Sequence, residues 1–347
     1  MKFSTALKLP FFVVRLLFNI FHAALVGLVR RPKSWSLFRH IQYTVLRTAY
    51  KDRGIFALVT ERGSTIKVYR TYMKKIKSEP EVIDLGDGAC GGWIGSSKAK
   101  NVLLYLHGGG YINPAHPKHI EMLGELVKAG KKQGKDFSVF AVEYGLAPNT
   151  QYPKQMIQGT SALKYLIETA GFSPENILLS GDSAGGNLSC AVLSCLSHPH
   201  PATATIDLGG KKLAGVFFIS PWMTFETDRG SMITNADKDY LDAGSIDYLG
   251  DKFLGGAKKD PYNEPLSADP EWWQDLPVKD ICILGAEYEM LVDSIKDWAA
   301  KVKVHNPDAE LYIAPAEVHV QQVSDRGLFL GVAKSEVYFS NWILSRV

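Results

Sequence analysis

The chain has 347 residues, of which 46% are hydrophobic and 22% are charged, the proportions of an ordinary globular protein. Its net charge of +3, without any basic tract, predicts no nucleic-acid partner. The length accommodates one large α/β domain with an attached subdomain, or two small domains.

The first predicted element is an apolar helix near the N-terminus. Leu9–Val29 is long enough to span a bilayer, but Arg15, Asn19 and His22 fall on one helical face. Because a charge near mid-bilayer costs about 2.5–3.5 kcal/mol, three interpretations are open: a signal-anchor that tolerates Arg15, an amphipathic helix in the membrane interface, and a lid docked on the domain. We assign residues 1–34 to a membrane anchor or cap and expect membrane association through residues 9–29.

The charges flanking this helix favour one orientation weakly. Lys2 and Lys8 precede the apolar run, and Arg30, Arg31 and Lys33 follow it. That slight excess favours a cytosolic C-terminal part, and the endoplasmic reticulum is one candidate membrane; a cytoplasmic protein is the alternative. A cleaved signal peptide is not favoured, because the run is long and no small-residue cleavage site follows it.

The remaining residues, 35–347, are predicted to form an α/β domain of alternating strands and helices. Residues 35–75 are expected to be partly helical, and the alternation begins at about Glu79. Strands are predicted at residues 101–106, 137–144, 176–181, 213–222, 280–287 and 309–316, and helices at 155–171, 186–196, 294–305 and 335–347. Continuous apolar strands alternating with helices are typical of a mostly parallel sheet covered on both faces.

The segment at about 222–274 breaks this alternation. It is rich in aromatic residues, Gly and Pro, and it has no strand-like run. We interpret it as a cap insertion over the carboxyl ends of the strands, where such sheets bind ligands. Its aromatic side chains could hold a bulky apolar group or form the core of the cap: Trp222, Phe225, Tyr240, Tyr248 and Trp272.

A candidate nucleophile lies between the predicted strand at 176–181 and the predicted helix at 186–196. Residues 181–185, Gly-Asp-Ser-Ala-Gly, match the pattern G-x-S-x-G. That pattern places a serine on a strained turn with small neighbours, at a helix N-terminus that supplies backbone donors. Ser183 is therefore predicted to be a nucleophile.

A serine nucleophile needs a base, and the base needs an orienting acid. His319 follows the last predicted strand in a short loop, whereas the other histidines are expected in the glycine motif, the N-terminal segment, loops or exposed helix ends: His22, His40, His107, His116, His119, His198, His200 and His305. The acid should follow the strand at 280–287, in the chain order Ser, acid, His. Of the candidates Glu287, Glu289 and Asp293 we favour Glu289, because Glu287 comes early and Asp293 falls inside the next helix.

Three glycines follow the strand at 101–106 in the sequence His107-Gly-Gly-Gly-Tyr111. Preorganised backbone N–H groups stabilise the oxyanion of a tetrahedral intermediate, and one donor is worth about 3–4 kcal/mol. We predict that Gly108, Gly109 and Ala184 supply these donors. A phosphate-binding loop is the alternative, but neither a Lys-Ser/Thr pair nor a correctly spaced acidic residue follows.

The motifs together resemble the hormone-sensitive-lipase family of α/β-hydrolases, which includes arylacetamide deacetylases and fungal steryl acetyl hydrolases. The matching stretches are HGGGY at 107–111, EYGLAPNTQYPKQ at 143–155, GDSAGGN at 181–187, SPW at 220–222, PLSA at 265–268, GAEYEMLVD at 285–293 and EVH at 317–319. The resemblance implies Glu289 as the acid, with Asp293 second, and an N-terminal segment that forms part of a cap or a membrane anchor. Gly145 and Asn149 depart from the family's usual Arg and Glu.

The sequence thus predicts a serine carboxylic-ester hydrolase that acts on a small-molecule ester. The resemblance implies a short acyl group, acetyl first, and a bulky apolar alcohol that Tyr111 and Trp222 contact. We expect no metal and no cofactor, and the four cysteines match no zinc spacing: Cys90, Cys190, Cys195 and Cys282. An amidase or lactonase with the same triad is the alternative, followed by a non-catalytic ligand receptor on this fold. The sequence does not predict an oligomeric state.

Overall fold

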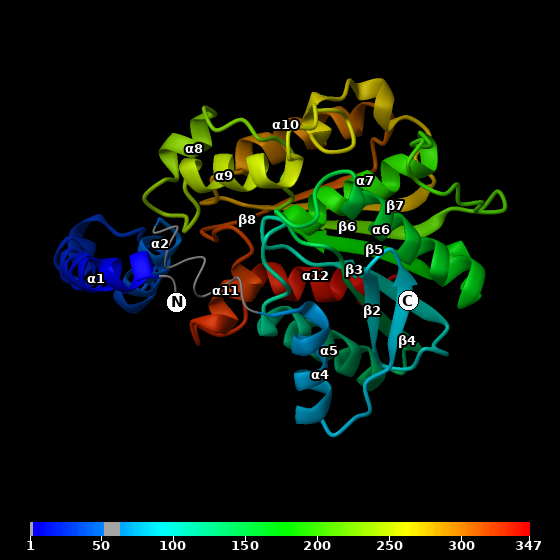
Figure 1. The fold of residues 1–347 in the computed structure, drawn as a ribbon, viewed down its shortest axis with the longest axis horizontal. Helices are drawn as coiled ribbons and strands as arrows, with labels where there is room; N and C mark the ends of the chain where they lie inside the picture. The colour runs from blue at the N-terminus through cyan, green and yellow to red at the C-terminus, as the bar shows by residue number, and fades with distance from the viewer. Residues whose placement is uncertain (1–2, 52–62) are drawn as a thin grey trace.

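Over residues 3–51 and 63–347, which a computed structural model describes, the chain forms an eight-stranded sheet with helices on both faces (Figure 1). The strands are β1 (Val82–Gly86), β2 (Ala89–Ile94), β3 (Asn101–Leu106), β4 (Phe137–Glu143), β5 (Ile177–Asp182), β6 (Leu213–Ile219), β7 (Val278–Ala286) and β8 (Glu310–Ala314). Their order across the sheet is β1-β2-β4-β3-β5-β6-β7-β8. Strands β1, β2 and β4 pair antiparallel and the other neighbours are parallel, so the predicted mostly parallel α/β sheet is confirmed.

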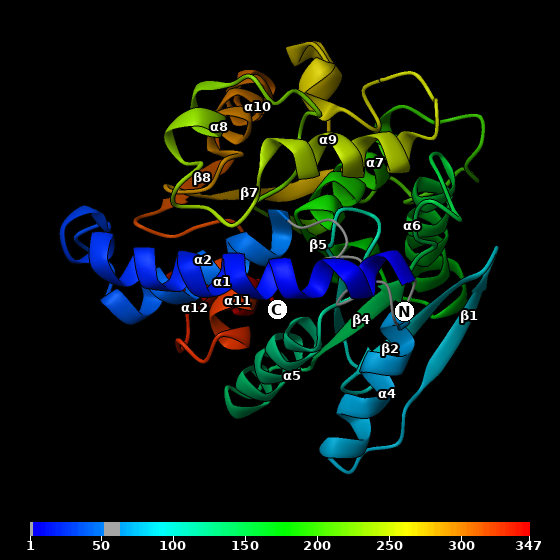
Figure 2. The ribbon, with the colours of Figure 1, turned by 60° about the vertical axis from the view of Figure 1, so that its left-hand side comes forward.

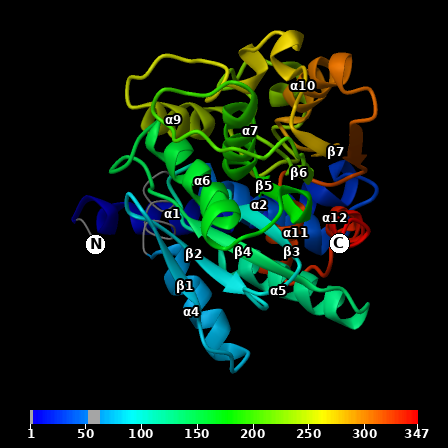
Figure 3. The ribbon, with the colours of Figure 1, turned by 90° about the vertical axis from the view of Figure 1, so that its right-hand side faces the viewer.

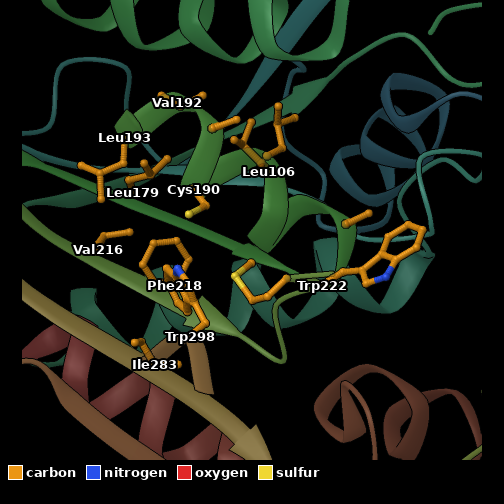
Figure 4. Close-up of a cluster of buried hydrophobic side chains, with 14 of the residues drawn as sticks. Leu106, Leu179, Cys190, Val192, Leu193, Val216, Phe218, Trp222, Ile283 and Trp298 are labelled. Atoms are coloured by element: carbon orange, nitrogen blue, oxygen red, sulfur yellow. The ribbon is translucent and has the colours of Figure 1, made fainter. Parts of the chain in front are cut away.

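The central strands β3, β5 and β6 are almost completely buried, because helices cover both of their faces. This explains why they read as continuous apolar runs rather than as alternating patterns. One face carries α6 (Lys154–Lys164), α7 (Ala184–Ser197) and α10 (Val292–His305), and the other carries α5 (Pro117–Lys132) and α12 (Lys334–Leu344) (Figure 1). Figure 4 shows part of the core on the first face, where Leu179, Val216 and Phe218 of the sheet meet Cys190 and Leu193 of α7.

The sequence analysis did not predict β1 and β2, which extend the sheet at one edge (Figure 3). Strand β1 is half-buried to exposed along its length, and β2 contains Gly91 and Gly92. Neither strand therefore presents the apolar run that marks the central strands, and their pairing with each other and with β4 decides their structure.

The predicted cap insertion lies between β6 and β7. It forms α8 (Gly230–Thr234), α9 (Ala243–Leu254) and two 3₁₀ turns, Pro265–Ser267 and Pro270–Trp273. Asp242 caps α9 by accepting a hydrogen bond from the Ser245 N–H, and Gly255 ends the helix in a left-handed conformation.

Among the described residues, three helices precede the sheet: α1 (Phe3–Arg30), α2 (Leu37–Lys51) and α4 (Thr65–Lys75). Helix α1 lies alongside α2 (Figure 2). Helix α2 docks on the hydrolase domain through Arg39, which donates to both carboxylate oxygens of Asp325 on α11 (Gln321–Gly327). Residues 52–62, inside the segment predicted to be partly helical, lie outside the described residues.

A core substitution tests this packing. Trp298 of α10 is buried and lies against Phe218 (Figure 4). Its ring packs edge-on against those of Phe218 and Trp273, with centroids 5.0 and 5.6 Å apart. We expect Trp298→Ala to lower the free energy of unfolding by about 3–5 kcal/mol, because it leaves a large cavity. Chemical denaturation would measure the loss. The control, Val304→Ala, lies on the exposed side of the same helix and should change stability by less than about 0.5 kcal/mol; equal effects of the two substitutions would contradict this account of the core.

Candidate active site

Ser183 occupies the turn between β5 and α7. Its backbone has φ 53° and ψ −118°, a strained conformation that directs the side chain out of the turn. Helix α7 begins directly against the end of β3, because a Cβ on Gly185 would lie 2.0 Å from the carbonyl oxygen of Leu106. The small residue at 185 therefore allows the turn to hold Ser183 at the carboxyl end of the sheet.

A chain of hydrogen bonds joins Ser183, His319 and Glu289. The Ser183 hydroxyl lies 2.9 Å from His319 Nε2, and His319 Nδ1 lies 2.8 Å from Glu289 Oε2. The second oxygen, Glu289 Oε1, accepts from the N–H of Ala286 at 2.6 Å. Since His319 and Glu289 are buried, both are held in one orientation toward the serine. We call this chain of three side chains the relay.

The two other candidate acids lie elsewhere. Glu287 accepts a hydrogen bond from the Ala316 N–H at 2.7 Å, and Asp293 accepts one from the Ser231 N–H at 2.7 Å. Glu289 is therefore the carboxylate that reaches His319, although it follows the strand by a few residues rather than directly.

The protonation of His319 depends on the carboxylates around it. Burial alone would lower the pKa of His319, but the hydrogen bond and the charge of Glu289 raise it above its ordinary value. The charges of Asp239 and Asp182 act in the same direction. The imidazole is thus a stronger base than a free histidine, which suits it to accept the serine proton.

Asp182, the residue before Ser183, is a buried acceptor for three donors. It accepts from the Tyr105 hydroxyl at 2.7 Å, the Gly108 N–H at 2.9 Å and His119 Nε2 at 3.0 Å. Burial raises its pKa, but the charge and hydrogen bond of His119, with the two other bonds, hold the pKa below its ordinary value. His119 is therefore buried on α5 against Asp182, and the prediction that grouped it with histidines of the N-terminal segment, loops or exposed helix ends was wrong for this residue.

The predicted oxyanion donors need one correction. The N–H of Gly108 is used by Asp182, and a Cβ at Gly108 would lie 2.2 Å from Asp182 Oδ2. The N–H groups of Gly109 and Gly110 donate to no partner within residues 3–51 and 63–347, and both glycines line the cavity beside Ser183. Gly110 thus replaces Gly108 as a candidate donor, whereas Ala184, in the first turn of α7, stays one.

A cavity of about 540 Å³ opens on Ser183 and His319. Its walls come from the glycine loop, the insertion, α2, α4, α11 and the start of α10. They are mainly apolar: Leu46, Tyr50, Val68, Pro114, Trp222, Tyr240, Leu241, Ile246, Leu249, Leu291, Val323 and Leu328. Of the predicted substrate contacts, Trp222 lines this cavity. Tyr111 does not: its ring stacks on Phe253 and its hydroxyl donates to Asn187 Oδ1 at 2.6 Å, so its role as a substrate contact is not supported.

Asp239, in the insertion, is a buried residue that the sequence analysis missed. Its carboxylate accepts from the N–H of Met290 at 2.7 Å and from that of Tyr240 at 2.8 Å. Burial raises the pKa of Asp239 to about 6. The bond to Met290 ties the insertion to the segment that carries Glu289, and no motif around Asp239 signals this long-range contact.

Comparisons with known proteins agree with this architecture. A model of the α/β-hydrolase fold family matches residues 103–323. Carboxylesterase NlhH of Mycobacterium tuberculosis is 32% identical over 149 residues, which cover 42% of each chain. Steryl acetyl hydrolase 1 of Saccharomyces cerevisiae is 29% identical over 188 residues, which cover 50% of this chain and 41% of the relative. The match therefore spans less than half the length of both relatives.

A solved structure extends the similarity over most of the chain. An esterase from the bacterial hormone-sensitive lipase family has a TM-score of 0.66 and 25% identity, and the match covers 88% of this chain and 98% of that one. The predicted fold class and the predicted family resemblance are confirmed.

The relay predicts a pH effect. Substituting Glu289→Gln removes the contributions that raise the pKa of His319 most, so burial weighs more and the pKa falls. Because the base acts in its neutral form, the acid limb of the kcat/KM profile should move to lower pH. The rate itself should drop by about 10⁴-fold, as when the acid of a comparable triad becomes an amide. Steady-state kinetics from acidic to neutral pH would show both changes.

Asp293→Asn is the matched control, because it neutralises the carboxylate of the other candidate acid. It should leave both kcat/KM and its pH profile close to those of the wild type. A pH profile that moves in Asp293→Asn and stays in Glu289→Gln would refute the relay.

Proposed function

The chain belongs to the α/β-hydrolase fold family, and on that premise we propose that it is a serine hydrolase of carboxylic esters. The observation that carries the proposal is the relay Ser183–His319–Glu289 at the floor of an apolar cavity. The names of its relatives, a carboxylesterase and a steryl acetyl hydrolase, support the same chemistry.

The reaction begins with proton transfer within the relay. His319 Nε2 accepts the Ser183 proton while Ser183 Oγ forms a bond to the ester carbonyl carbon, and the imidazolium is stabilised by Glu289. The N–H groups of Gly109, Gly110 and Ala184 bind the oxyanion. His319 then returns the proton to the leaving alcohol, which leaves an acyl-enzyme on Ser183. Water, deprotonated by His319, attacks the acyl carbon, the bond from that carbon to Ser183 Oγ breaks, and His319 returns the proton to Ser183 as the acid leaves. Each of these steps uses protein groups and water.

We further propose that the acyl group is short, acetyl first, and that the alcohol is bulky and apolar. The cavity of about 540 Å³ suits a drug-sized group, and Trp222, Tyr240 and Leu249 give it apolar walls. The relative named steryl acetyl hydrolase supports this choice. The same relay would also serve an amide or a lactone, so these substrates belong in the test.

The proposal includes association with a membrane through residues 9–29. In the described part of the chain, Pro10–Val29 is the one helical stretch long and apolar enough to span a membrane, by length and composition. Its mean hydropathy is 2.0 and 17% of it is buried against the protein.

A substrate panel with a nucleophile variant tests the hydrolase. The purified chain should hydrolyse p-nitrophenyl acetate faster than longer acyl esters, and Ser183→Ala should reduce kcat by about 10⁶-fold, because the acyl-enzyme then cannot form. Intact-mass spectrometry after rapid quenching should find the acetyl adduct on the wild type and not on the variant.

Ser197→Ala, at the far end of the same helix, is the matched control and should keep wild-type rates. Equal turnover by the wild type and Ser183→Ala would rule out the serine mechanism. Faster cleavage of amides or lactones than of esters would move the assignment to those classes.

A further inference from the structure

Helix α1 has a protein-facing side and an exposed side. Ala23 and Gly27 are buried, and Asn19 Nδ2 donates to Thr48 Oγ1 of α2 at 3.0 Å. The exposed side carries large apolar side chains at intervals of three and four residues: Phe11, Val14, Leu17, Phe18, Phe21, Leu25, Leu28 and Val29. These residues form an apolar stripe about 28 Å long, which no part of the described chain covers.

The contacts between α1 and α2 make the two helices an antiparallel pair. Asn19 meets Thr48, whereas Gly27 packs closely against His40, where an added Cβ would lie 2.6 Å from the imidazole. A later residue of α1 therefore contacts an earlier residue of α2, as two antiparallel helices require. At the end of α1, the Arg31 guanidinium donates to the carbonyl oxygen of Gly27 at 2.8 Å, beside this close contact.

Helix α2 is in turn bound to the hydrolase domain. Arg39 binds Asp325 of α11 at 2.7 and 2.8 Å, and Arg47 donates to the carbonyl oxygen of Asp239 at 2.6 Å. If α1 crossed a bilayer, α2 with these basic side chains would have to enter the hydrocarbon, or the contacts between the helices would be lost. The contacts are compatible with a helix that lies along the domain, with its stripe outward.

The charge distribution indicates what covers the stripe. Residues 1–51 contain nine Lys and Arg and no Asp or Glu, whereas the rest of the chain contains thirty basic and thirty-six acidic residues. A helical pair that is basic and carries an apolar stripe matches an anionic lipid surface, which combines apolar insertion with attraction to headgroups. A second copy of this chain would instead oppose two like-charged pairs.

The helix that α1 packs against, α2, also forms part of the cavity wall. Leu46 and Tyr50 of α2 line it, as does Leu328 at the end of α11, and the next residue, Phe329, is 88% exposed. Figure 2 shows α1 in front of α2 and α11 in this view. For an apolar ester dissolved in a membrane beneath the stripe, the nearer wall of the cavity would thus be the one that α2 forms.

We propose that α1 lies flat in the surface of an anionic membrane, without crossing it, and that the cavity takes its ester from that membrane. The substrate class is then an ester that partitions into lipid rather than one dissolved in water. This inference rests on the proposed ester hydrolysis for its substrate and on the α1–α2 contacts for its geometry.

The first experiment measures vesicle binding and turnover with charged variants of the stripe. In the full chain, Phe18→Asp with Phe21→Asp alters side chains that are 64% and 63% exposed. We expect at least about a tenfold loss of flotation with phosphatidylcholine–phosphatidylglycerol vesicles, because a buried charge opposes insertion. Turnover of a long-chain alcohol acetate dissolved in those vesicles should fall by the same factor. Turnover of p-nitrophenyl acetate without vesicles should stay at the wild-type rate.

Val304→Asp with Val337→Asp is the matched control, because these apolar side chains on α10 and α12 are 60% and 50% exposed. It should keep wild-type binding and both rates. Unchanged vesicle binding or unchanged turnover of the vesicle ester in the Phe18/Phe21 variant would overturn the proposal. If the wild type does not hydrolyse p-nitrophenyl acetate at all, the proposed function is refuted. The flotation result would still decide whether α1 contacts the membrane.

The second experiment separates a flat helix from a spanning one. The full chain with a tag before Met1 would be synthesised in the presence of sealed microsomes and treated with protease from outside. A flat helix leaves the tag and the hydrolase domain on one side, so both should be digested, or both protected if the chain is translocated. A tag protected while the domain is digested, or the reverse, would overturn the flat arrangement. So would an α1-dependent dimer that remains unbound to the microsomes.

Discussion

The close contact between the start of α7 and the end of β3 is the constraint on which the site depends. Gly185 lies against the carbonyl oxygen of Leu106, so the helix can begin immediately after Ser183. This contact keeps the strained backbone of Ser183 in place, since relaxation would push the helix away from the sheet. The same turn carries Asp182, which binds the glycine loop through the Gly108 N–H. One turn thus positions both Ser183, the proposed nucleophile, and the loop that would stabilise the oxyanion.

The buried carboxylates around His319 each have their own set of donors. Glu289 is bound by His319 and the Ala286 N–H, whereas Asp182 is bound by His119, a tyrosine and a glycine N–H. Their fields raise the pKa of His319 against the effect of burial. Asp239 is different, because its donors are two backbone N–H groups and burial raises its pKa to about 6. The site therefore combines Glu289, which orients the proposed base His319, with Asp182 and Asp239, which bind the glycine loop and the insertion to the site.

Local patterns predicted the parts of the site that local structure determines. Ser183 follows from a strand, a turn of small residues and a helix, and His319 and Glu289 follow from loops after strands in a fixed chain order; the structure joins them by hydrogen bonds. Position after the strand favoured Glu289 among the three acids and the family resemblance agreed, but only the structure reveals which way each loop side chain points. Gly108 was misassigned for a related reason: its partner, the Asp182 side chain, is 74 residues away along the chain. The edge strands β1 and β2 were missed because their pairing, not their hydropathy, decides them.

The sequence of the N-terminal helix α1 fits two different surroundings, the protein on one side and an exposed apolar surface on the other. Asn19 interrupts the apolar run that a spanning helix needs, yet in the structure it binds Thr48 and helps to hold α1 on α2. The apolar residues that the interruption leaves on the other side form the exposed stripe. Because α2 packs against α1 and also carries Leu46 and Tyr50 of the cavity wall, a single helix connects α1 to the cavity. If α1 contacts lipid as we propose, that contact would act on the wall that Leu46 and Tyr50 form, so the membrane surface and the cavity would be linked through α2.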